Sequence, residues 1–215
     1  MFLDARFRGH DDGGTTDFFC ELLTQDTRVV NPPKSLKTER LRLRRAKLTD
    51  AEVIFRQYAQ DVEVTKYVSW RAHQNVEETR EYVRMCLLAW DVGKAYHWVI
   101  ERKEDNQLIG MIIARVNVEK WELGFVLARP FWGQGYMTET VKGIIAWALK
   151  QKEIYRIWAV CDVDNLASAR VMEKAGMQRE GILRRWSVHP NISDEPRDSY
   201  CFAITKQKRD GNGQE

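Results

Sequence analysis

The residues with the clearest chemical potential lie in one short segment of the 215-residue chain, Trp132-Gly-Gln-Gly-Tyr-Met-Thr138. Two glycines one residue apart, Gly133 and Gly135, let the backbone bend sharply and keep side chains away, so that successive N–H groups converge on an anion. The helix-like run from Val141 to Lys150 follows, and its start adds free N–H groups and the positive end of a helix dipole. The segment therefore predicts a cradle for phosphate groups.

Two common nucleotide-binding loops do not match this cradle. A loop for nucleoside triphosphates has Lys and then Ser or Thr directly after its last glycine, whereas Tyr136, Met137 and Thr138 follow Gly135 here. A dinucleotide fold needs a third Gly or Ala at the Thr138 position and a strand-loop-helix unit near the start of its domain. Neither condition is met cleanly, so the loop pattern alone does not identify which phosphate-bearing cofactor it serves.

The other residues with metal-binding or nucleophilic chemistry are dispersed. The cysteines are Cys20, Cys86, Cys161 and Cys201, and the histidines are His10, His73, His97 and His189. No two of them have the close spacing of a metal site or a redox turn, so we expect no metal. We interpret Cys161, at the end of a predicted strand, as a small core residue and not as a nucleophile. We interpret His97 as a packed histidine.

Composition points to an ordinary globular protein, with 44% hydrophobic and 30% charged residues. The net charge of +3 comes from interleaved signs, which does not indicate direct binding to nucleic acid. No apolar run approaches the roughly 20 residues that cross a bilayer, and the start lacks a basic segment followed by an apolar one. We therefore predict a cytoplasmic protein without a membrane partner.

The chain divides into a leader, one domain and a tail. Residues 1–34 carry Gly-Gly, Pro-Pro and several Asp and predict a poorly ordered leader. From Arg40 to Ala46, polar and apolar residues alternate with period two, which predicts the first strand of the domain. The domain is expected to cover residues 35–206, and residues 207–215 form a C-terminal tail.

Two helices and three strands are predicted before the cradle. Thr49 and Glu52 have the spacing of a capping box for a helix through Gln60, and Asn75 caps a second helix that ends near Trp90. An aromatic loop, residues 64–70, separates the helices. Strands follow at Tyr96–Glu101, Leu108–Val118 and Trp121–Leu127, and their short connections predict an antiparallel meander.

After the cradle helix, the apolar run Tyr155–Val160 predicts a buried strand, and a strand-helix-strand crossover makes it parallel to the strand before the cradle. Asn165 caps one more helix, which closes at Gly176. The final strands are Met177–Leu183 and Asp198–Thr205. The elements together predict an α/β fold with a mixed, mostly antiparallel sheet of about seven strands.

This order of elements resembles the GNAT superfamily of N-acetyltransferases over residues 35–205, on three motifs. They are Trp132–Tyr136 with Thr138-Glu139, Asn165–Met177, and Glu180–Arg184. Within the superfamily the chain looks most like the Rim-type branch, whose members acetylate N-terminal amines of ribosomal proteins, and the opening Thr38–Arg44 is similar too. Pro130 and Met137 depart from the pattern, because the superfamily often has Arg or Gln and Ala there.

The resemblance implies a GNAT fold with helices on both faces of the sheet, a splayed central parallel pair, and acetyl-CoA as co-substrate without a metal. It implies that a backbone N–H near Val126 or Leu127 stabilises the tetrahedral intermediate. Ser168 resembles the hydroxyl that protonates the leaving thiolate in the Rim-type branch. The implied cofactor-binding residues are Phe125, Val126, Leu127, Trp132, Gly133, Gln134, Gly135, Tyr136, Met137, Thr138, Asn165 and Ser168.

An amine attacks a thioester only as the neutral base. A lysine amine, with a pKa of about 10.4, needs a proton acceptor at neutral pH, whereas an N-terminal α-amine at roughly 7.7 to 8.0 needs much less help. Glu122, on the strand that leads to the cradle, is the first candidate base. The alternative for Glu122 is a solvent-facing position in the period-two alternation of its strand.

We therefore predict direct transfer of an acetyl group from acetyl-CoA to an amine, with a protein N-terminal α-amine as the favoured acceptor. A small-molecule amine (an antibiotic, a polyamine or an amino acid) is the first alternative. A non-catalytic acyl-CoA-binding sensor is the second. Residues 64–74 and 189–198, which we expect to form the acceptor wall, contain no readable specificity code. A monomer or a homodimer is expected.

Overall fold

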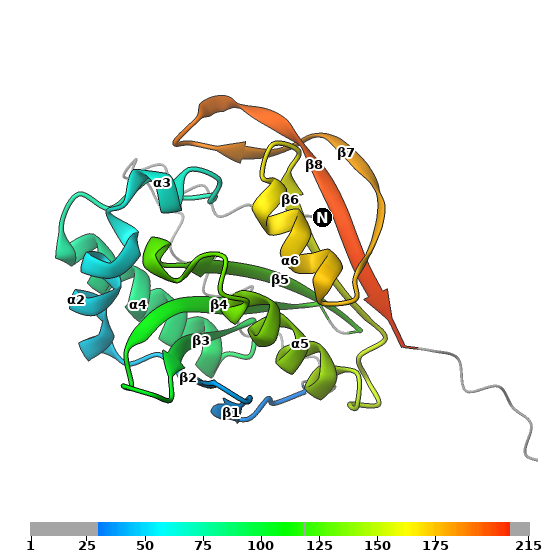
Figure 1. Ribbon diagram of the computed structural model, residues 1–215, viewed down its shortest axis with the longest axis horizontal. Helices are drawn as coiled ribbons and strands as arrows, with labels where there is room; N and C mark the ends of the chain where they lie inside the picture. Colours follow the sequence, from blue (N-terminus) through cyan, green and yellow to red (C-terminus); the bar gives the residue numbers. More distant parts are fainter. Residues whose placement is uncertain (1–29, 118, 207–215) are drawn as a thin grey trace, which may run out of the picture.

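A computed structural model of the protein describes residues 30–117 and 119–206. These residues form one central sheet with helices packed against it (Figure 1). The sheet has eight strands in the order β1-β2-β3-β4-β5-β6-β8-β7, one more than expected. The strands are β1 (Ser35–Lys37), β2 (Leu41–Arg45), β3 (Ala95–Arg102), β4 (Leu108–Asn117), β5 (Lys120–Leu127), β6 (Arg156–Asp162), β7 (Gln178–His189) and β8 (Ser193–Thr205). The additional strand is β1, a short edge strand paired with β2. Residues 1–29 of the predicted leader and the whole predicted tail lie outside the described residues.

The helices are η1 (Leu48–Asp50), α2 (Ala51–Ile54), η2 (Phe55–Ala59), α3 (Val62–Thr65), α4 (Val76–Asp91), η3 (Arg129–Phe131), α5 (Tyr136–Ala148) and α6 (Leu166–Lys174). The helix predicted from Thr49 to Gln60 is confirmed in its place, since residues 48–59 are helical throughout, but it consists of a 3-10 turn, an α-helical turn and a π-helical turn. The predicted capping box is wrong. The carboxylate of Asp50 accepts the Lys47 N–H at 2.7 Å, while Glu52 pairs with Arg56 at the surface.

Helix α5 begins at Tyr136, five residues before the predicted start at Val141, whereas two other helix starts follow the sequence. The Asn75 side-chain oxygen accepts the Glu78 N–H at 3.1 Å and begins α4, and Asn165 accepts the Ser168 N–H at 3.1 Å and begins α6. Gly176 has a φ of 93°, the left-handed conformation that favours glycine after a helix end. These local hydrogen bonds confirm both predicted caps and the predicted helix stop.

The antiparallel meander β3-β4-β5 is confirmed, and β5 and β6 form the expected parallel pair. The parallel register is short: it joins residues 120–122 to residues 156–158, whereas β5 stays paired with β4 as far as Leu127. Beyond Glu122 the two strands therefore diverge, as Figure 1 shows for the green β5 and the yellow β6. This divergence is the predicted splay.

Helices cover both faces of the sheet. Trp121 of β5 packs on Trp147 of α5, with ring centroids 5.6 Å apart. On the opposite face, Tyr82 of α4 meets His97 of β3 edge to face at 6.3 Å. Because side chains alternate along a strand, Glu122 lies on the face opposite to Trp121, which is the α4 face.

The last two strands run longer than predicted, from Gln178 to His189 and from Ser193 to Thr205. Their register shifts between Leu183 and Ser187, where Arg185 has a φ of 46°. This irregularity interrupts the period-two pattern, so the full length of the strand could not be predicted from the sequence.

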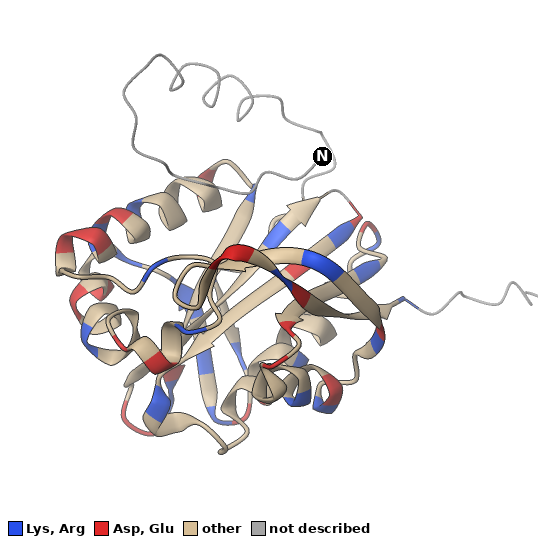
Figure 2. Cartoon of the chain, turned by 90° about the horizontal axis from the view of Figure 1, so that it is seen from above, with Lys and Arg blue, Asp and Glu red and all other residues tan. Residues whose placement is uncertain are grey.

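Acidic and basic residues are interspersed over the molecule (Figure 2). Within residues 30–117 and 119–206, no helix is both long and apolar enough to cross a membrane.

Candidate active site

The predicted phosphate cradle follows directly from the end of β5. Gly133 and Gly135 both have left-handed backbones, with φ values of 75° and 79°, and Gly135 is the residue before α5. Any other L-residue is strained at these φ values, so the chain needs glycine at both positions. The two bends and the start of α5 have the backbone geometry that the sequence predicts, and phosphate binding there stays a prediction.

Side chains of the loop hold it against the strand end. The Trp132 indole N–H donates to the Leu127 carbonyl oxygen at 2.6 Å. The Gln134 side-chain amide donates to the Pro130 carbonyl at 2.8 Å, so this side chain folds back onto its own loop. Met137, a departure from the superfamily pattern, is 4% exposed and largely fills core space. The loop is therefore braced by its own side chains before any ligand binds.

A second brace comes from the start of the domain. The Arg40 guanidinium donates from Nη1 to the Gln134 carbonyl at 3.0 Å and from Nε to Glu139 of α5 at 2.7 Å. Glu139 also accepts the Arg40 backbone N–H and the Thr38 hydroxyl. Burial acts to raise the pKa of Glu139, but these hydrogen bonds outweigh it and hold the pKa below its usual value. The sequence did not predict this second brace, because Arg40 and Glu139 are 99 positions apart.

The backbone of β5 beyond Glu122 has one edge free of β6. The Ala128 N–H donates to the Ile109 carbonyl at 2.8 Å, so by alternation the N–H of Val126 also points at β4. The amides of Phe125 and Leu127 then point at the gap between β5 and β6. Of the two amides predicted to stabilise the tetrahedral intermediate, the geometry therefore favours Leu127 over Val126.

The opposite wall of the gap is β6 with α6. Ser168, in the first turn of α6, lies near enough to Cys161 on β6 to act on the pKa of its thiol. Burial raises the pKa of Cys161 to about 12, although the Ser168 contact opposes this. The thiol is therefore protonated at neutral pH, which agrees with a packing role and not with a nucleophile.

One cavity of about 3370 Å³ connects these features. It runs from the cradle past Leu127 and Ser168 to Glu122, and residues from both faces of the sheet line it. Every predicted site residue lines this cavity except Gln134, whose side chain is turned back onto Pro130. The gap between β5 and β6 thus joins the cradle on one face to Glu122 on the other.

Comparison with known proteins agrees with this arrangement. Residues 40–178 match the family model described as "Acetyltransferase (GNAT) domain". The chain belongs to the GNAT acetyltransferases. A relative named uncharacterized N-acetyltransferase p20, from Bacillus licheniformis, is 31% identical over 182 residues, which are 83% of this chain and 99% of the relative.

Solved structures are similar as well. A GNAT-family acetyltransferase from Bacillus anthracis is 29% identical with a TM-score of 0.70, over 80% of this chain and 98% of that one. RimL, an α-N-acetyltransferase of ribosomal L7/L12 in complex with coenzyme A, has a TM-score of 0.72 at 20% identity, over 80% of this chain and 97% of that one. This GNAT chain is therefore an acetyl-CoA-dependent N-acetyltransferase, and Rim-type enzymes are among its structural neighbours.

Glu122 lies at the point where β5 and β6 of this GNAT fold diverge. Its carboxylate pairs with Arg115 of β4 at 3.2 Å, and its side chain is 26% exposed. It lines the cavity, so its side chain faces the site and not only bulk solvent. Three residues separate Glu122 from Phe125, a span of about 10 Å in a strand, so a proton from the gap would reach Glu122 through water. Its role as the base stays a prediction, as does that of Ser168 as the acid.

The α4 side of the cavity is aromatic. Trp70 packs on His73 with ring centroids 4.8 Å apart and the rings tilted by 42°, and both rings lie near Tyr82 of α4. All three side chains line the cavity. Trp70 belongs to the loop predicted to be aromatic, His73 follows that loop, and Tyr82 lies on α4, so the three rings form an aromatic part of the cavity wall.

A lip, formed by residues 65–72 and 187–194, closes over this side. The Asn191 amide donates to the Thr65 carbonyl at 2.7 Å and to the Trp70 carbonyl at 2.8 Å, and its oxygen accepts the Ala72 N–H at 3.0 Å. One side chain thus joins two segments that lie about 120 residues apart. Sequence reasoning expected both segments at the acceptor wall but gave no sign of Asn191 as the link.

Three histidines lie on the α4 side, and burial lowers the pKa of each. The pKa of His97 falls to about 3, because burial and the nearby Arg115 both disfavour its charged form. Burial also lowers the pKa of His73 and of His189, although Asp162, 3.7 Å from His189, opposes the shift there. These rings are therefore neutral at physiological pH. No group of described residues has the His, Cys, Asp and Glu composition of a metal site.

Proposed function

We propose that this GNAT enzyme acetylates the N-terminal α-amine of a protein or peptide. The observation that carries the proposal is the size of the cavity, about 3370 Å³, against roughly 300 to 1,000 Å³ for a typical small-molecule pocket. A groove of that volume has room for coenzyme A together with an extended chain end. The Rim-type neighbours, one of which carries a ribosomal-protein α-amine activity in its name, point to the same acceptor class.

In the proposed reaction, the neutral amine attacks the thioester carbonyl carbon in the gap between β5 and β6. The C–N bond forms, and the carbonyl oxygen takes up negative charge beside the amide of Leu127 or Phe125. The proton on the attacking nitrogen passes through water to Glu122. When the C–S bond breaks, Ser168 donates a hydrogen bond or a proton to the thiolate and is reprotonated from solvent. An α-amine suits this arrangement because roughly a tenth or more of it is neutral near pH 7.

An acceptor screen tests the proposal. Each peptide is offered in two matched forms, one with a free Ala or Ser α-amine and one with that amine formylated, and both contain an internal lysine. We expect coenzyme A release and a mass increase at the α-amine with the free form only. Equal turnover of the formylated peptide would identify lysine as the acceptor and contradict the proposal.

A small amine that carries a ring is the second candidate, because Trp70, His73 and Tyr82 form a surface on which a flat group can stack. The same screen extended to polyamines, aminoglycosides and aromatic amino acids separates the two acceptor classes. Turnover of an aromatic amine with no turnover of free-amine peptides would favour this second candidate. For the cellular site, we propose the cytoplasm, where acetyl-CoA and nascent chains are both present.

A further inference from the structure

Arg40 stands apart from the other basic residues of the sheet because it lies beside the phosphate cradle. It precedes β2, lines the cavity, and keeps 43% of its side chain exposed. Its guanidinium carbon Cζ lies over the ring of Tyr136, the first residue of α5, at 4.5 Å from the ring centroid. A Cβ atom placed on Gly135 would lie 3.5 Å from Arg40 Nη2. The guanidinium therefore borders the same space as the cradle amides.

The guanidinium is held on two of its three nitrogens. Nε is bonded to Glu139 and Nη1 to the Gln134 carbonyl, whereas no hydrogen bond to Nη2 is found among the described residues. A planar guanidinium fixed in this way loses little conformational freedom when its remaining N–H groups bind an anion. Nη2 is thus an oriented, unused donor next to two left-handed glycines.

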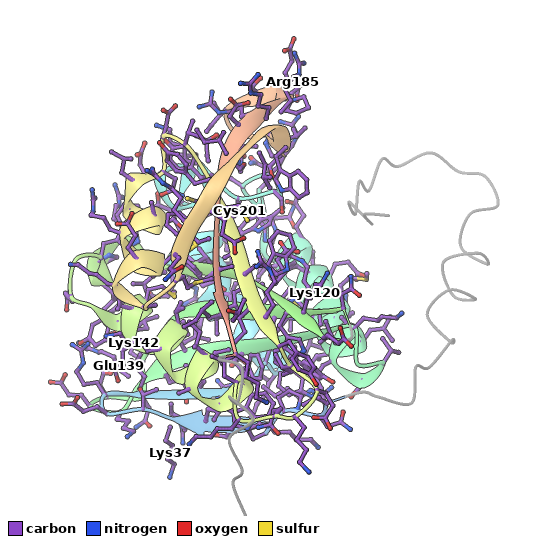
Figure 3. The ribbon with its side chains drawn as sticks, turned by 90° about the vertical axis from the view of Figure 1, so that its right-hand side faces the viewer. Lys37, Lys120, Glu139, Lys142, Arg185 and Cys201 are labelled. Atoms are coloured by element: carbon purple, nitrogen blue, oxygen red, sulfur yellow. The ribbon has the colours of Figure 1, made fainter. Side chains whose placement is uncertain are left out.

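Charge in this region also favours an anion. Lys142, one turn after Glu139 on α5, lines the cavity on the same side as Arg40, and Figure 3 shows Glu139 and Lys142 next to each other. Glu139 itself is occupied by donors from Thr38 and Arg40. The start of α5 adds the positive end of its dipole. Phosphate oxygens accept charge-assisted hydrogen bonds from arginine that are roughly twice as strong as neutral ones.

We propose that Arg40 binds a phosphate group of coenzyme A through Nη2, in addition to bracing the cradle. The diphosphate and the 3′-phosphate share the chemistry that this donor recognises. The proposal rests on the acetyl-CoA dependence of the GNAT family and is independent of the acceptor. A binding measurement without any acceptor therefore tests it, whatever the outcome of the acceptor screen.

The experiment measures dissociation constants by calorimetry for coenzyme A, dephospho-coenzyme A and pantetheine, the last titrated at millimolar concentration. Arg40→Gln should weaken coenzyme A about tenfold, in the range of one charge-assisted hydrogen bond, and leave pantetheine unchanged. If dephospho-coenzyme A is weakened as much as coenzyme A, the ligand is the diphosphate. If it is not weakened, the ligand is the 3′-phosphate.

The chain offers a matched control in Arg42. This arginine is two residues further on, has a similar exposure of 42%, and pairs with Glu101 at 2.6 Å, but it does not line the cavity. Arg42→Gln should change none of the three dissociation constants by more than about twofold. If Arg40→Gln does not fold, Arg40→Lys replaces it, since lysine keeps the charge but loses the fork, and a loss of about threefold is expected for coenzyme A but not for pantetheine.

Two outcomes overturn the proposal. In the first, Arg40→Gln leaves the affinity for coenzyme A unchanged, which means that Nη2 meets no phosphate. In the second, Glu139→Gln, which weakens the brace but keeps the guanidinium, weakens coenzyme A as much as Arg40→Gln does, which means that Arg40 acts only by bracing the cradle. A loss that is larger in Arg40→Gln than in Glu139→Gln, and that is confined to the phosphate-bearing ligands, supports direct contact.

Discussion

The two ends of the cavity are built in different ways. The cradle end uses backbone N–H groups from one continuous stretch, residues 127–139, and fixes them with two left-handed glycines and the braces from Trp132 and Arg40. The α4 end uses side chains from segments far apart in the sequence, held together at the lip by Asn191. The cradle end therefore depends on backbone conformation, and the α4 end depends on side-chain contacts between distant segments.

This difference would let the acceptor end change while the co-substrate end stays the same. Backbone amides bind a phosphate whatever the neighbouring side chains are, provided that the glycines stay. Side chains at the lip and on α4 can be exchanged without disturbing those amides, because the splay of β5 and β6 lies between the two ends. Substitutions at each end should therefore affect different substrates, and this expectation can be tested.

The largest effect is expected at the cradle. Gly135→Val forces a β-branched residue into a φ of 79° and brings its side chain against Arg40. The backbone strain alone costs about 1–2 kcal/mol, and the side chain also covers the cradle, so we expect the dissociation constant of acetyl-CoA to rise about 100-fold. Gly181→Ala is the control, because a Cβ at Gly181 meets no atom within 4 Å and the affinity should stay within twofold. Normal acetyl-CoA binding by Gly135→Val would contradict a backbone cradle.

The same contrast explains what the sequence could predict. The glycine loop, the Asn165 cap and the Gly176 stop are local, because each depends on residues within a few positions of one another. The crossover rule then placed β6 parallel to β5. These features fix the fold and the cradle end of the site.

The remaining features depend on contacts between distant residues. Neither the pairing of Arg40 with Glu139 nor that of Asn191 with Trp70 leaves a local pattern, since the partners are 99 and 121 positions apart. The cap of the first helix was predicted wrongly for a more local reason, because Asp50 accepts the Lys47 N–H and pairs with Arg44 of β2, so the helical segment begins before the predicted cap. The sequence therefore indicated which segments form the α4 end of the cavity, but not which of their side chains contact one another.

The second prediction concerns pH and the α4 end, where all three described histidines lie. The pKa of His97 is about 3 in the fold and about 6.5 when unfolded, so between these values the unfolded chain binds more protons. Stability should therefore fall on acidification, by about 2 kcal/mol between pH 6.5 and 5 from His97 alone. Urea unfolding at the two pH values measures this loss.

A variant isolates the contribution of His97. His97→Gln carries no titrating group and should reduce the acid-induced loss of stability by about that amount. Hydrogen exchange at pH 5 should increase first in β3 and α4 and only later in α5. An equal loss of stability in His97→Gln would assign the acid sensitivity to other groups.

The third prediction concerns Glu122. Glu122→Gln should lower kcat/KM for the acceptor about tenfold at pH 6.5, because proton removal then limits the rate, and progressively less above about pH 8, where an α-amine is already neutral. Acetyl-CoA affinity should be unchanged. Arg115→Gln is the matched control, since it breaks the same ion pair but leaves the carboxylate in place. An unaltered pH profile in Glu122→Gln would remove Glu122 as the base.

The smallest effect is expected at the lip. Asn191→Ala removes three hydrogen bonds that join residues 65–72 to the β7–β8 turn, so the two segments separate more readily over the α4 end. We expect the KM for the acceptor to rise about fivefold, the equivalent of one net hydrogen bond of about 1 kcal/mol, while the KM for acetyl-CoA stays constant.

The control lies in the same lip. Asp194→Ala breaks only an ion pair with Arg71 in which both side chains are largely exposed, at 88% and 70%. Such surface pairs contribute about 0–1 kcal/mol, so its effect on the acceptor KM should stay below that of Asn191→Ala. If Asn191→Ala raised the KM for acetyl-CoA as much as the KM for the acceptor, the two ends of the cavity would be coupled. Acetyl-CoA binding and acceptor binding would then not be independent in this enzyme.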